Sequence, residues 1–210
     1  MASAFFYGTL MHPKILKRVL HNDASHLQIC PAILMDYTRH KVKFADYPAI
    51  LPCERSKTLL GRELTLEENS IRGALVTGFT TMDIMFLDVF EGDQYVRREV
   101  YVHPLGRLTA VPSDAAVTSS GATVDGCLIP AVLPPLPSAS ELAHPIPAQT
   151  YVWGLEDSGL EKELWSFDEF VSKNAYRWIG PGARSNEDYT EVDVVRERLS
   201  GKVVPYEAQL

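Results

Sequence analysis

The chain of 210 residues is long enough to bury a hydrophobic core, and 46% of its residues are hydrophobic. Its formal net charge is −7, and Lys and Arg form no block along the sequence, so it lacks the basic footprint of a nucleic-acid-binding protein. The composition therefore predicts one domain over residues 1–210 with no nucleic-acid partner.

Three cysteines, Cys30, Cys53 and Cys127, are widely spaced, with no Cys-x-x-Cys pair and no nearby His cluster. An odd number of isolated cysteines indicates reduced thiols rather than a metal site. The first residues lack a charged segment followed by a long apolar one, and no stretch reaches the roughly 18 apolar residues of a membrane span. We expect a cytoplasmic protein with no metal and no membrane partner.

The first elements in chain order are a buried strand at 3–8 and a helix at 12–20. Pro13 suits the first turn of that helix, and apolar residues follow it at helical spacing. Further strands are predicted at 27–34 and, from the alternating pattern, at 37–44.

The middle of the chain continues this mixture of strands and helices. The segment 47–52, Tyr-Pro-Ala-Ile-Leu-Pro, is predicted as a rigid turn at the edge of a sheet. A strand follows at 71–77, where Gly73 indicates a close approach of backbones, and a helix at 81–91 places a glutamate at its C-terminal end. Residues 95–103 alternate as a strand does.

The composition shifts to Ala, Ser, Thr, Pro and Gly at about 105–148, and such a stretch cannot bury enough apolar surface to order itself alone. We interpret it as a low-complexity insertion between two strands of one sheet. Within it we expect loose packing at 113–122 and one strand or hairpin arm at 124–132.

The sheet is predicted to resume at 148–154, and 160–171 has the pattern of an amphipathic C-terminal helix. Residues 181–210 are polar and predict a tail or a wrapping arm. Because strands and helices alternate irregularly rather than as uniform βαβ units, an α+β fold with a mixed sheet, open or closed into a barrel, is favoured.

The loop Tyr7-Gly8-Thr9-Leu10, at the end of the first strand, is the first candidate binding element. A strand that ends in a glycine turn before a helix presents unpaired N–H groups, which suit a carboxylate or a phosphate. We expect the amides of Gly8, Thr9 and Leu10 to converge on a cavity; the alternative is an ordinary strand-to-helix turn. Neither a dinucleotide fingerprint nor a Walker loop is present, so no cofactor is predicted.

Glu91, between Phe90 and Gly92, is the candidate proton-transfer residue. Apolar surroundings would raise the pKa of its carboxyl group toward neutrality and let it exchange protons. The alternative is a glutamate that caps a surface turn. Asp88 and Asp93 lie close by, and the sequence does not identify which of the three carboxylates is buried.

Tyr95 and Arg97 follow in the next strand, on one face. Their functional interpretation is a phenol aimed into the pocket and an arginine that orients a carboxylate. The alternative is a core tyrosine and a solvated arginine at the edge of the sheet.

The Tyr7–Leu10 loop and the segment Leu87-Asp88-x-Phe90-Glu91-Gly92-x-x-Tyr95-x-Arg97 together resemble the gamma-glutamylcyclotransferase-like superfamily, in its plant- and fungal-type AIG2-like branch. Two further segments are similar to the family pattern, Tyr47-Pro48-Ala49-Ile50 and Tyr151-Val152-Trp153. The resemblance covers 4–103 and 148–154. It implies a small mixed β-barrel flanked by helices, and a pocket in which Tyr47 and Tyr151 join the loop in binding the substrate.

What the resemblance implies chemically is a cofactor-free enzyme of the acyltransferase or cyclising-lyase type. The loop would hold a small substrate that carries a carboxylate, and Glu91 would serve as acid and base in releasing 5-oxoproline and an amine or amino acid from a gamma-glutamyl donor. Three rivals remain open: an enzyme acting on another small amide such as a gamma-glutamylamine, a tailoring enzyme for a glutathione conjugate, and a non-catalytic protein that binds a small carboxylate or, through the insertion, a partner.

Overall fold

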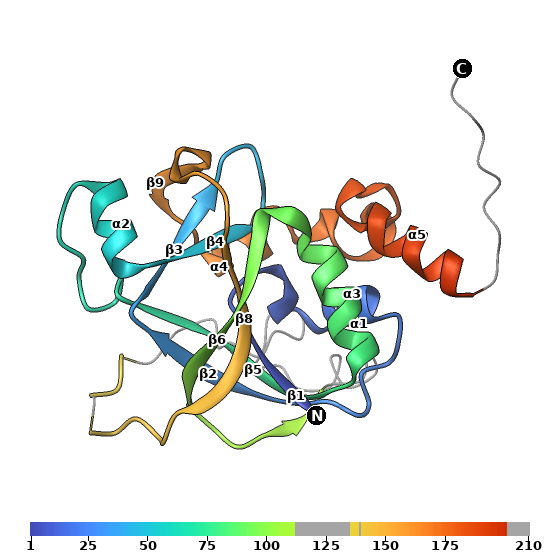
Figure 1. Cartoon of the computed structure of the whole chain (residues 1–210), viewed down its shortest axis with the longest axis horizontal. Helices are drawn as coiled ribbons and strands as arrows, with labels where there is room; N and C mark the ends of the chain where they lie inside the picture. Colours follow the sequence, from blue (N-terminus) through green and yellow to red (C-terminus); the bar gives the residue numbers. More distant parts are fainter. Residues whose placement is uncertain (112–134, 139, 201–210) are drawn as a thin grey trace.

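A closed β-barrel forms the centre of the computed structural model, which describes residues 1–111, 135–138 and 140–200 (Figure 1). Five strands follow one another in the order β5-β1-β8-β6-β2, and pairing of β2 with β5 closes the ring. The β1–β8 pair is parallel and the other pairs are antiparallel, which confirms a mixed barrel. The barrel strands are β1 (Ala2–Phe6), β2 (Gln28–Met35), β5 (Ser70–Phe79), β6 (Tyr95–Pro104) and β8 (Ile146–Trp153). The short β7 (Thr109–Ala110) pairs antiparallel with the start of β2.

Close packing inside the barrel explains the glycine in β5. A Cβ atom added at Gly73 would lie 2.2 Å from the carbonyl oxygen of Phe6 on the neighbouring β1, a distance that no side chain tolerates. The predicted close approach of backbones is confirmed here. The interior of the barrel is filled by alternate residues of its strands, among them Phe5 and Leu75, both fully buried.

A second, three-stranded antiparallel sheet lies beside the barrel, in the order β4-β3-β9. It contains β3 (Tyr37–Val42), β4 (Pro48–Pro52) and β9 (Leu160–Leu164). The prediction of a rigid turn at 47–52 is wrong, because this segment is the edge strand β4, whose register pairs Ile50 with Arg39. An edge strand tolerates proline because the missing N–H can face away from the neighbouring strand. The two prolines of β4 therefore fit a strand, although in the sequence they resemble a turn signal.

The predicted amphipathic helix at 160–171 is also corrected. Its first half is the strand β9, and only α4 (Phe167–Lys173) is helical. The Ser166 side chain accepts a hydrogen bond from the Glu169 N–H and so begins the helix at that point. Apolar and aromatic residues continue across the junction at mixed helical spacing, so the periodicity of the sequence does not reveal the boundary.

Four further helices surround the sheets: α1 (Pro13–Leu20), α2 (Cys53–Leu60), α3 (Thr81–Glu91) and α5 (Thr190–Leu199). In α3 a capping box fixes the first turn, because the Thr80 hydroxyl accepts from the Asp83 N–H and the Asp83 carboxylate accepts from the Thr80 N–H. Figure 1 shows α1, α3 and α5 gathered on one side, and β3, β4, β9, α2 and α4 on another. The predicted start of α1 and the position of Glu91 at the end of α3 are both confirmed.

The polar C-terminal segment wraps against the helices up to Ser200. Tyr189 and Val192 are buried, and the Arg18 guanidinium of α1 binds both carboxylate oxygens of Asp193 at 2.6 Å. Of the two predictions, tail or wrapping arm, the arm is confirmed as far as residue 200. Residues 201–210 lie outside the described part of the chain.

The insertion separates two neighbouring barrel strands, as predicted. β6 and β8 pair antiparallel, from Tyr95 opposite Trp153 to Val102 opposite Ile146. The segments 113–122 and 124–132, for which loose packing and a strand are predicted, lie outside the described residues.

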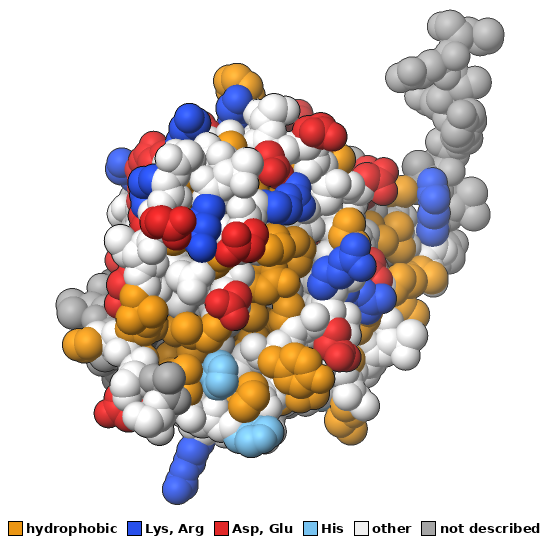
Figure 2. Space-filling model, turned by 60° about the vertical axis from the view of Figure 1, so that its left-hand side comes forward, with side chains coloured by type: hydrophobic (Ala, Val, Ile, Leu, Met, Phe, Trp, Pro, Cys, Tyr) orange, Lys and Arg blue, Asp and Glu red, His pale blue; other side chains and the backbone are white. Residues whose placement is uncertain are grey.

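Figure 2 shows a face on which Lys and Arg are interspersed with Asp and Glu in its upper part, while hydrophobic side chains gather below. No continuous basic stripe runs across this face. None of the helices in the described part of the chain has the length and apolar character needed to cross a membrane.

Candidate active site

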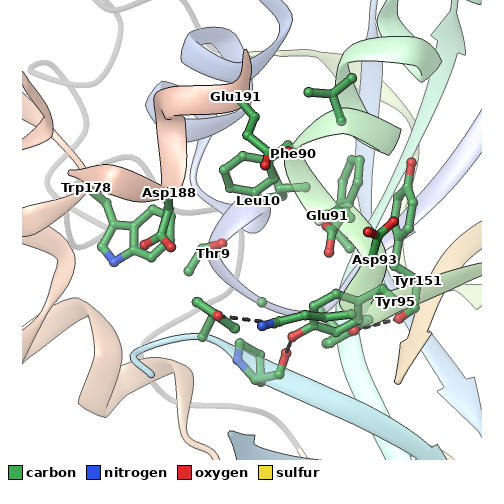
Figure 3. A pocket seen from close by; sticks show the side chains of 18 of the residues that line it. Thr9, Leu10, Phe90, Glu91, Asp93, Tyr95, Tyr151, Trp178, Asp188 and Glu191 are labelled. Carbon is green, nitrogen blue, oxygen red and sulfur yellow. Dashed lines mark hydrogen bonds between the residues drawn. The ribbon is translucent and has the colours of Figure 1, made fainter. Parts of the chain in front are cut away.

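A cavity of about 360 Å³ opens between the end of β1, the C-terminal end of α3, the start of β4 and the C-terminal segment (Figure 3). It brings together segments that are far apart in the sequence. Its lining comprises Phe5, Phe6, Tyr7, Gly8, Thr9, Leu10, Tyr47, Pro48, Val89, Phe90, Glu91, Gly92, Asp93, Gln94, Tyr95, Tyr151, Trp178, Glu187, Asp188 and Glu191.

The Tyr7–Leu10 loop forms one wall. The chain leaves β1 at Tyr7 and enters a 3-10 turn at Thr9–Met11, in which the Met11 N–H bonds to the Gly8 carbonyl oxygen at 3.0 Å. Within the described part of the chain, no protein acceptor takes the backbone N–H groups of Gly8, Thr9 or Leu10. These donors are therefore available to a ligand.

Glycine is required at position 8 for a steric reason. The φ angle of Gly8 is −126°, which a residue with a side chain can adopt, so left-handed backbone is not what demands it. A Cβ atom there would instead lie 2.8 Å from Cγ of Pro48. The first residue of β4 thus holds the loop against the second sheet.

Glu91 faces this loop from the end of α3, as Figure 3 shows. Burial, followed by repulsion from Asp88, raises the pKa of its carboxyl group to about 8. Its place at the C-terminal end of a helix, where the helix dipole is negative, acts in the same direction. Gly92 follows with a φ angle of +60°, which ends the helix directly after the carboxylate. A carboxyl group with such a pKa exchanges protons near neutral pH.

Four tyrosines complete the wall, each with its hydroxyl group engaged in a hydrogen bond. Tyr7 donates to the Tyr151 carbonyl oxygen at 2.6 Å, and Tyr151 donates to Asp88 at 2.8 Å. Tyr95 donates to the Pro48 carbonyl oxygen at 3.0 Å, and the Tyr47 hydroxyl donates to a glutamine side chain at 3.2 Å. Burial and then the charge of Glu91 raise the pKa of the Tyr151 hydroxyl, so it stays protonated as a donor.

The structure brings together all but one of the predicted site residues. Tyr7, Gly8, Thr9, Leu10, Tyr47, Glu91, Tyr95 and Tyr151 line the cavity. Arg97 does not: its Nε lies 3.2 Å from Asp88, and its side chain is 39% exposed. Of the three neighbouring carboxylates, Glu91 and Asp93 line the cavity, and Asp88 faces Tyr151 and Arg97.

The sequence analysis missed the part of the lining that comes from the C-terminal segment. Glu187, Asp188 and Glu191 reach the cavity from the stretch 181–210, which was interpreted as polar, and Trp178 reaches it from just before that stretch. Figure 3 shows Asp188 and Glu191 on the opposite side from Tyr95 and Tyr151. Among the described residues, five carboxylates line the cavity and no Lys, Arg or His does. The alternation of Tyr189 and Val192 with charged residues was the only signal in the sequence.

No group of three or more His, Cys, Asp and Glu side chains in the described residues is arranged to hold a metal ion. Cys30 and Cys53 are free and buried. The lining that is present consists of N–H donors, hydroxyl groups and carboxylates, which can bind a small polar molecule and transfer a proton.

Comparison with known proteins matches residues 4–118 to the family described as gamma-glutamyl cyclotransferase, AIG2-like. Among curated proteins of Arabidopsis thaliana, Protein AIG2 C is 28% identical over 100 residues, 48% of this chain and 51% of its own length. AIG2-like protein D is 30% identical over 102 residues, 49% of this chain and 57% of its own length. The chain therefore spans about half the length of the curated relatives it matches.

Two solved structures are similar at low identity. A solution structure from Arabidopsis thaliana is 18% identical with a TM-score of 0.48, covering 100% of this chain and 92% of that one. A yeast gamma-glutamyl cyclotransferase specific to glutathione is 14% identical with a TM-score of 0.46, covering 99% and 90%. The family model matches more than half of the chain, and the chain belongs to the gamma-glutamyl cyclotransferase, AIG2-like family.

Proposed function

We propose that this protein is a gamma-glutamylcyclotransferase-type enzyme that releases 5-oxoproline from a small gamma-glutamyl donor without a cofactor. One observation carries the proposal. Glu91, whose pKa is raised to about 8, and the Gly8 loop, whose N–H groups have no acceptor in the described part of the chain, line the same cavity of about 360 Å³. Family membership supports the general reaction class.

In the proposed mechanism the amides of Gly8, Thr9 and Leu10 bind the α-carboxylate of the glutamyl group. The neutral α-amine attacks the γ-carbonyl carbon, and the Glu91 carboxylate takes the proton that this nitrogen loses as the new C–N bond forms. The C–N bond to the leaving group then breaks, and Glu91 returns the proton to the departing amine. Because both reacting groups belong to one molecule, the enzyme's main tasks are to hold the folded conformation of the donor and to move the proton.

The charges of the lining favour one of the rival substrates over another. Asp188 and Glu191 lie on the side of the cavity opposite Tyr151, and Glu187 also lines it. A leaving group with a free carboxylate, such as the cysteinylglycine end of a glutathione conjugate, is repelled by these side chains. A gamma-glutamylamine, whose leaving group is neutral or cationic, is the donor that we propose.

The test is a panel of gamma-glutamyl donors with release of 5-oxoproline as the readout. We expect turnover with gamma-glutamylamines and slower turnover with gamma-glutamyl peptides that end in a carboxylate. Binding of these donors without release would support a non-catalytic binding protein instead. Absence of both binding and release across the panel would reject the proposal.

A further inference from the structure

Arg39, on β3, contacts the candidate site from behind the loop without lining the cavity. Its Nη1 donates a hydrogen bond of 2.7 Å to the carbonyl oxygen of Tyr7. The guanidinium also lies over the ring of Trp165, 4.9 Å from the ring centre. Both contacts fix the planar head of the side chain against the point where β1 becomes the binding loop.

Within the described part of the chain, Arg39 lacks the ion pair that other arginines of this protein form. Arg18 pairs with Asp193, Arg97 with Asp88 and Arg177 with Asp46. No carboxylate among the described residues forms an ion pair with Arg39. Burial lowers the pKa of Arg39 to about 10, so the group still carries its charge at neutral pH.

The hydrogen bond at Tyr7 acts directly on the first amide of the loop. The Tyr7 carbonyl and the Gly8 N–H are the two ends of one planar trans peptide group, so they point in opposite directions. With its oxygen bound to Arg39, this peptide directs the Gly8 N–H away from the arginine. A charged donor at the oxygen also polarises the peptide and strengthens the N–H as a donor.

An anionic substrate group needs such a cation. In the part of the chain that the structure describes, the cavity lining contains five carboxylates and no basic side chain, so these residues supply no positive charge to an α-carboxylate. Asp168 attracts Arg39 without forming an ion pair with it, and the charge of Arg39, one peptide group behind Gly8, offsets this deficit.

We propose that Arg39 is a positioning residue for the α-carboxylate of the substrate, acting through the Tyr7–Gly8 peptide. It holds that peptide with its N–H toward the ligand and supplies the positive potential that the lining lacks. This inference rests on the proposed function, because it assumes that the anion bound at the loop belongs to a gamma-glutamyl donor.

The test compares two donors that differ only in the carboxylate. One is a gamma-glutamylamine, and the other is the matching 4-aminobutanoyl amide, which keeps the amine and the carbonyl and cyclises to 2-pyrrolidinone. Each is assayed with the wild type, Arg39→Met, Arg39→Lys and the control Lys41→Met, which removes a surface charge from the same strand.

For Arg39→Met we expect kcat/KM on the gamma-glutamyl donor to fall about tenfold to a hundredfold, mainly through KM, with little change on the 4-aminobutanoyl donor. Arg39→Lys should recover part of the loss, and Lys41→Met should match the wild type. An equal fall on both donors, or no fall on either, would overturn the proposal.

A binding measurement separates this inference from the proposed function and does not depend on turnover. The wild type is titrated with 5-oxoproline and with 2-pyrrolidinone, and the same titrations are made with Arg39→Lys, whose fold is checked by its melting temperature. We expect the wild type to prefer 5-oxoproline and the variant to lose most of that preference. If the wild type shows no preference for the carboxylate, the inference fails even where donors are turned over.

Discussion

The chemistry of Glu91 depends on an environment that opposes its ionisation. Burial is the largest cause of its raised pKa, and repulsion from Asp88 is the second. Between pH 4.5 and about 8, the folded protein therefore keeps a proton on Glu91, whereas the unfolded chain has already released it. Since the folded state binds more protons in that window, stability falls as the pH rises through it, and the cost is complete above pH 8.

Replacement of Glu91 by Gln removes this cost, because the amide does not ionise. We expect the free energy of unfolding of Glu91→Gln to exceed that of the wild type at pH 8.5 by roughly 4–5 kcal/mol, and to equal it at pH 4. Urea unfolding at the two pH values measures the difference, with Glu99→Gln on the exposed part of β6 as the control. A gain of equal size at both pH values would show that the pKa of Glu91 is not the cause.

At the scale of elements, the Tyr7–Leu10 loop, which we propose binds the substrate, is held by contact between two sheets. Gly8 lies against Pro48, so a Cβ atom at position 8 would force β1 and β4 apart. We expect Gly8→Ala to lower stability by about 1–3 kcal/mol and to reduce turnover at least tenfold, because the loop amides lose their positions.

The matched control is Gly106→Ala, where the nearest atom to an added Cβ, Cδ of Pro31, is 3.9 Å away. This change should alter neither property. Thermal unfolding and lactam release of the two variants give the comparison, and a Gly8→Ala protein with wild-type turnover would contradict the proposed role of the loop.

Elements whose local signals agree with their packing could be predicted from the sequence. The strand β1, the helix α1 and the helix α3 with Glu91 at its end belong to this group, since glycine, proline and the helical spacing all indicate the same boundaries. β4 and β9 could not be predicted, because each takes its strand conformation from pairing with β3. Prolines in β4 favour a turn, and the spacing of apolar residues across 160–171 favours a helix, and long-range pairing overrides both local signals.

The same limit applies to the candidate site. Tyr7, Gly8 and Glu91 belong to local motifs and could be found from the sequence, whereas the roles proposed for Asp188 and Arg39 depend on contacts with distant segments. Arg97 shows the converse. Alternation correctly predicts the face of the strand on which it lies, but its guanidinium forms an ion pair with the nearby Asp88 instead of reaching the cavity.

At the scale of the whole molecule, the cavity is completed by a C-terminal segment, from Trp178 to Glu191, that is far from α3 (Thr81–Glu91) in the sequence. This segment gives the cavity its negative wall, with Asp188 and Glu191 among its carboxylates. Repulsion from Asp46, after burial, raises the pKa of the Asp188 carboxyl group, which indicates how densely the negative charge is placed there.

The wall predicts an order among donors with leaving groups of equal length. With gamma-glutamyl conjugates of 1,4-diaminobutane, butylamine and 4-aminobutyrate, we expect kcat/KM to decrease in that order, by several-fold at each step at low salt. Asp188→Asn combined with Glu191→Gln should reduce the differences in kcat/KM among the three donors, and so should 0.5 M NaCl. Glu197→Gln, on α5 like Glu191 but outside the lining, should leave the differences in kcat/KM unchanged. An unaltered series in the double variant would contradict the role given to the wall.

The most direct test of the central claim is the rate of 5-oxoproline release by Glu91→Gln. This substitution preserves size and hydrogen bonding and removes only the ability to exchange a proton. If Glu91 transfers the proton, kcat on a gamma-glutamylamine should fall by roughly 100-fold or more while the donor still binds, and Glu99→Gln should keep the wild-type rate. Release by Glu91→Gln at the wild-type rate would contradict the assignment.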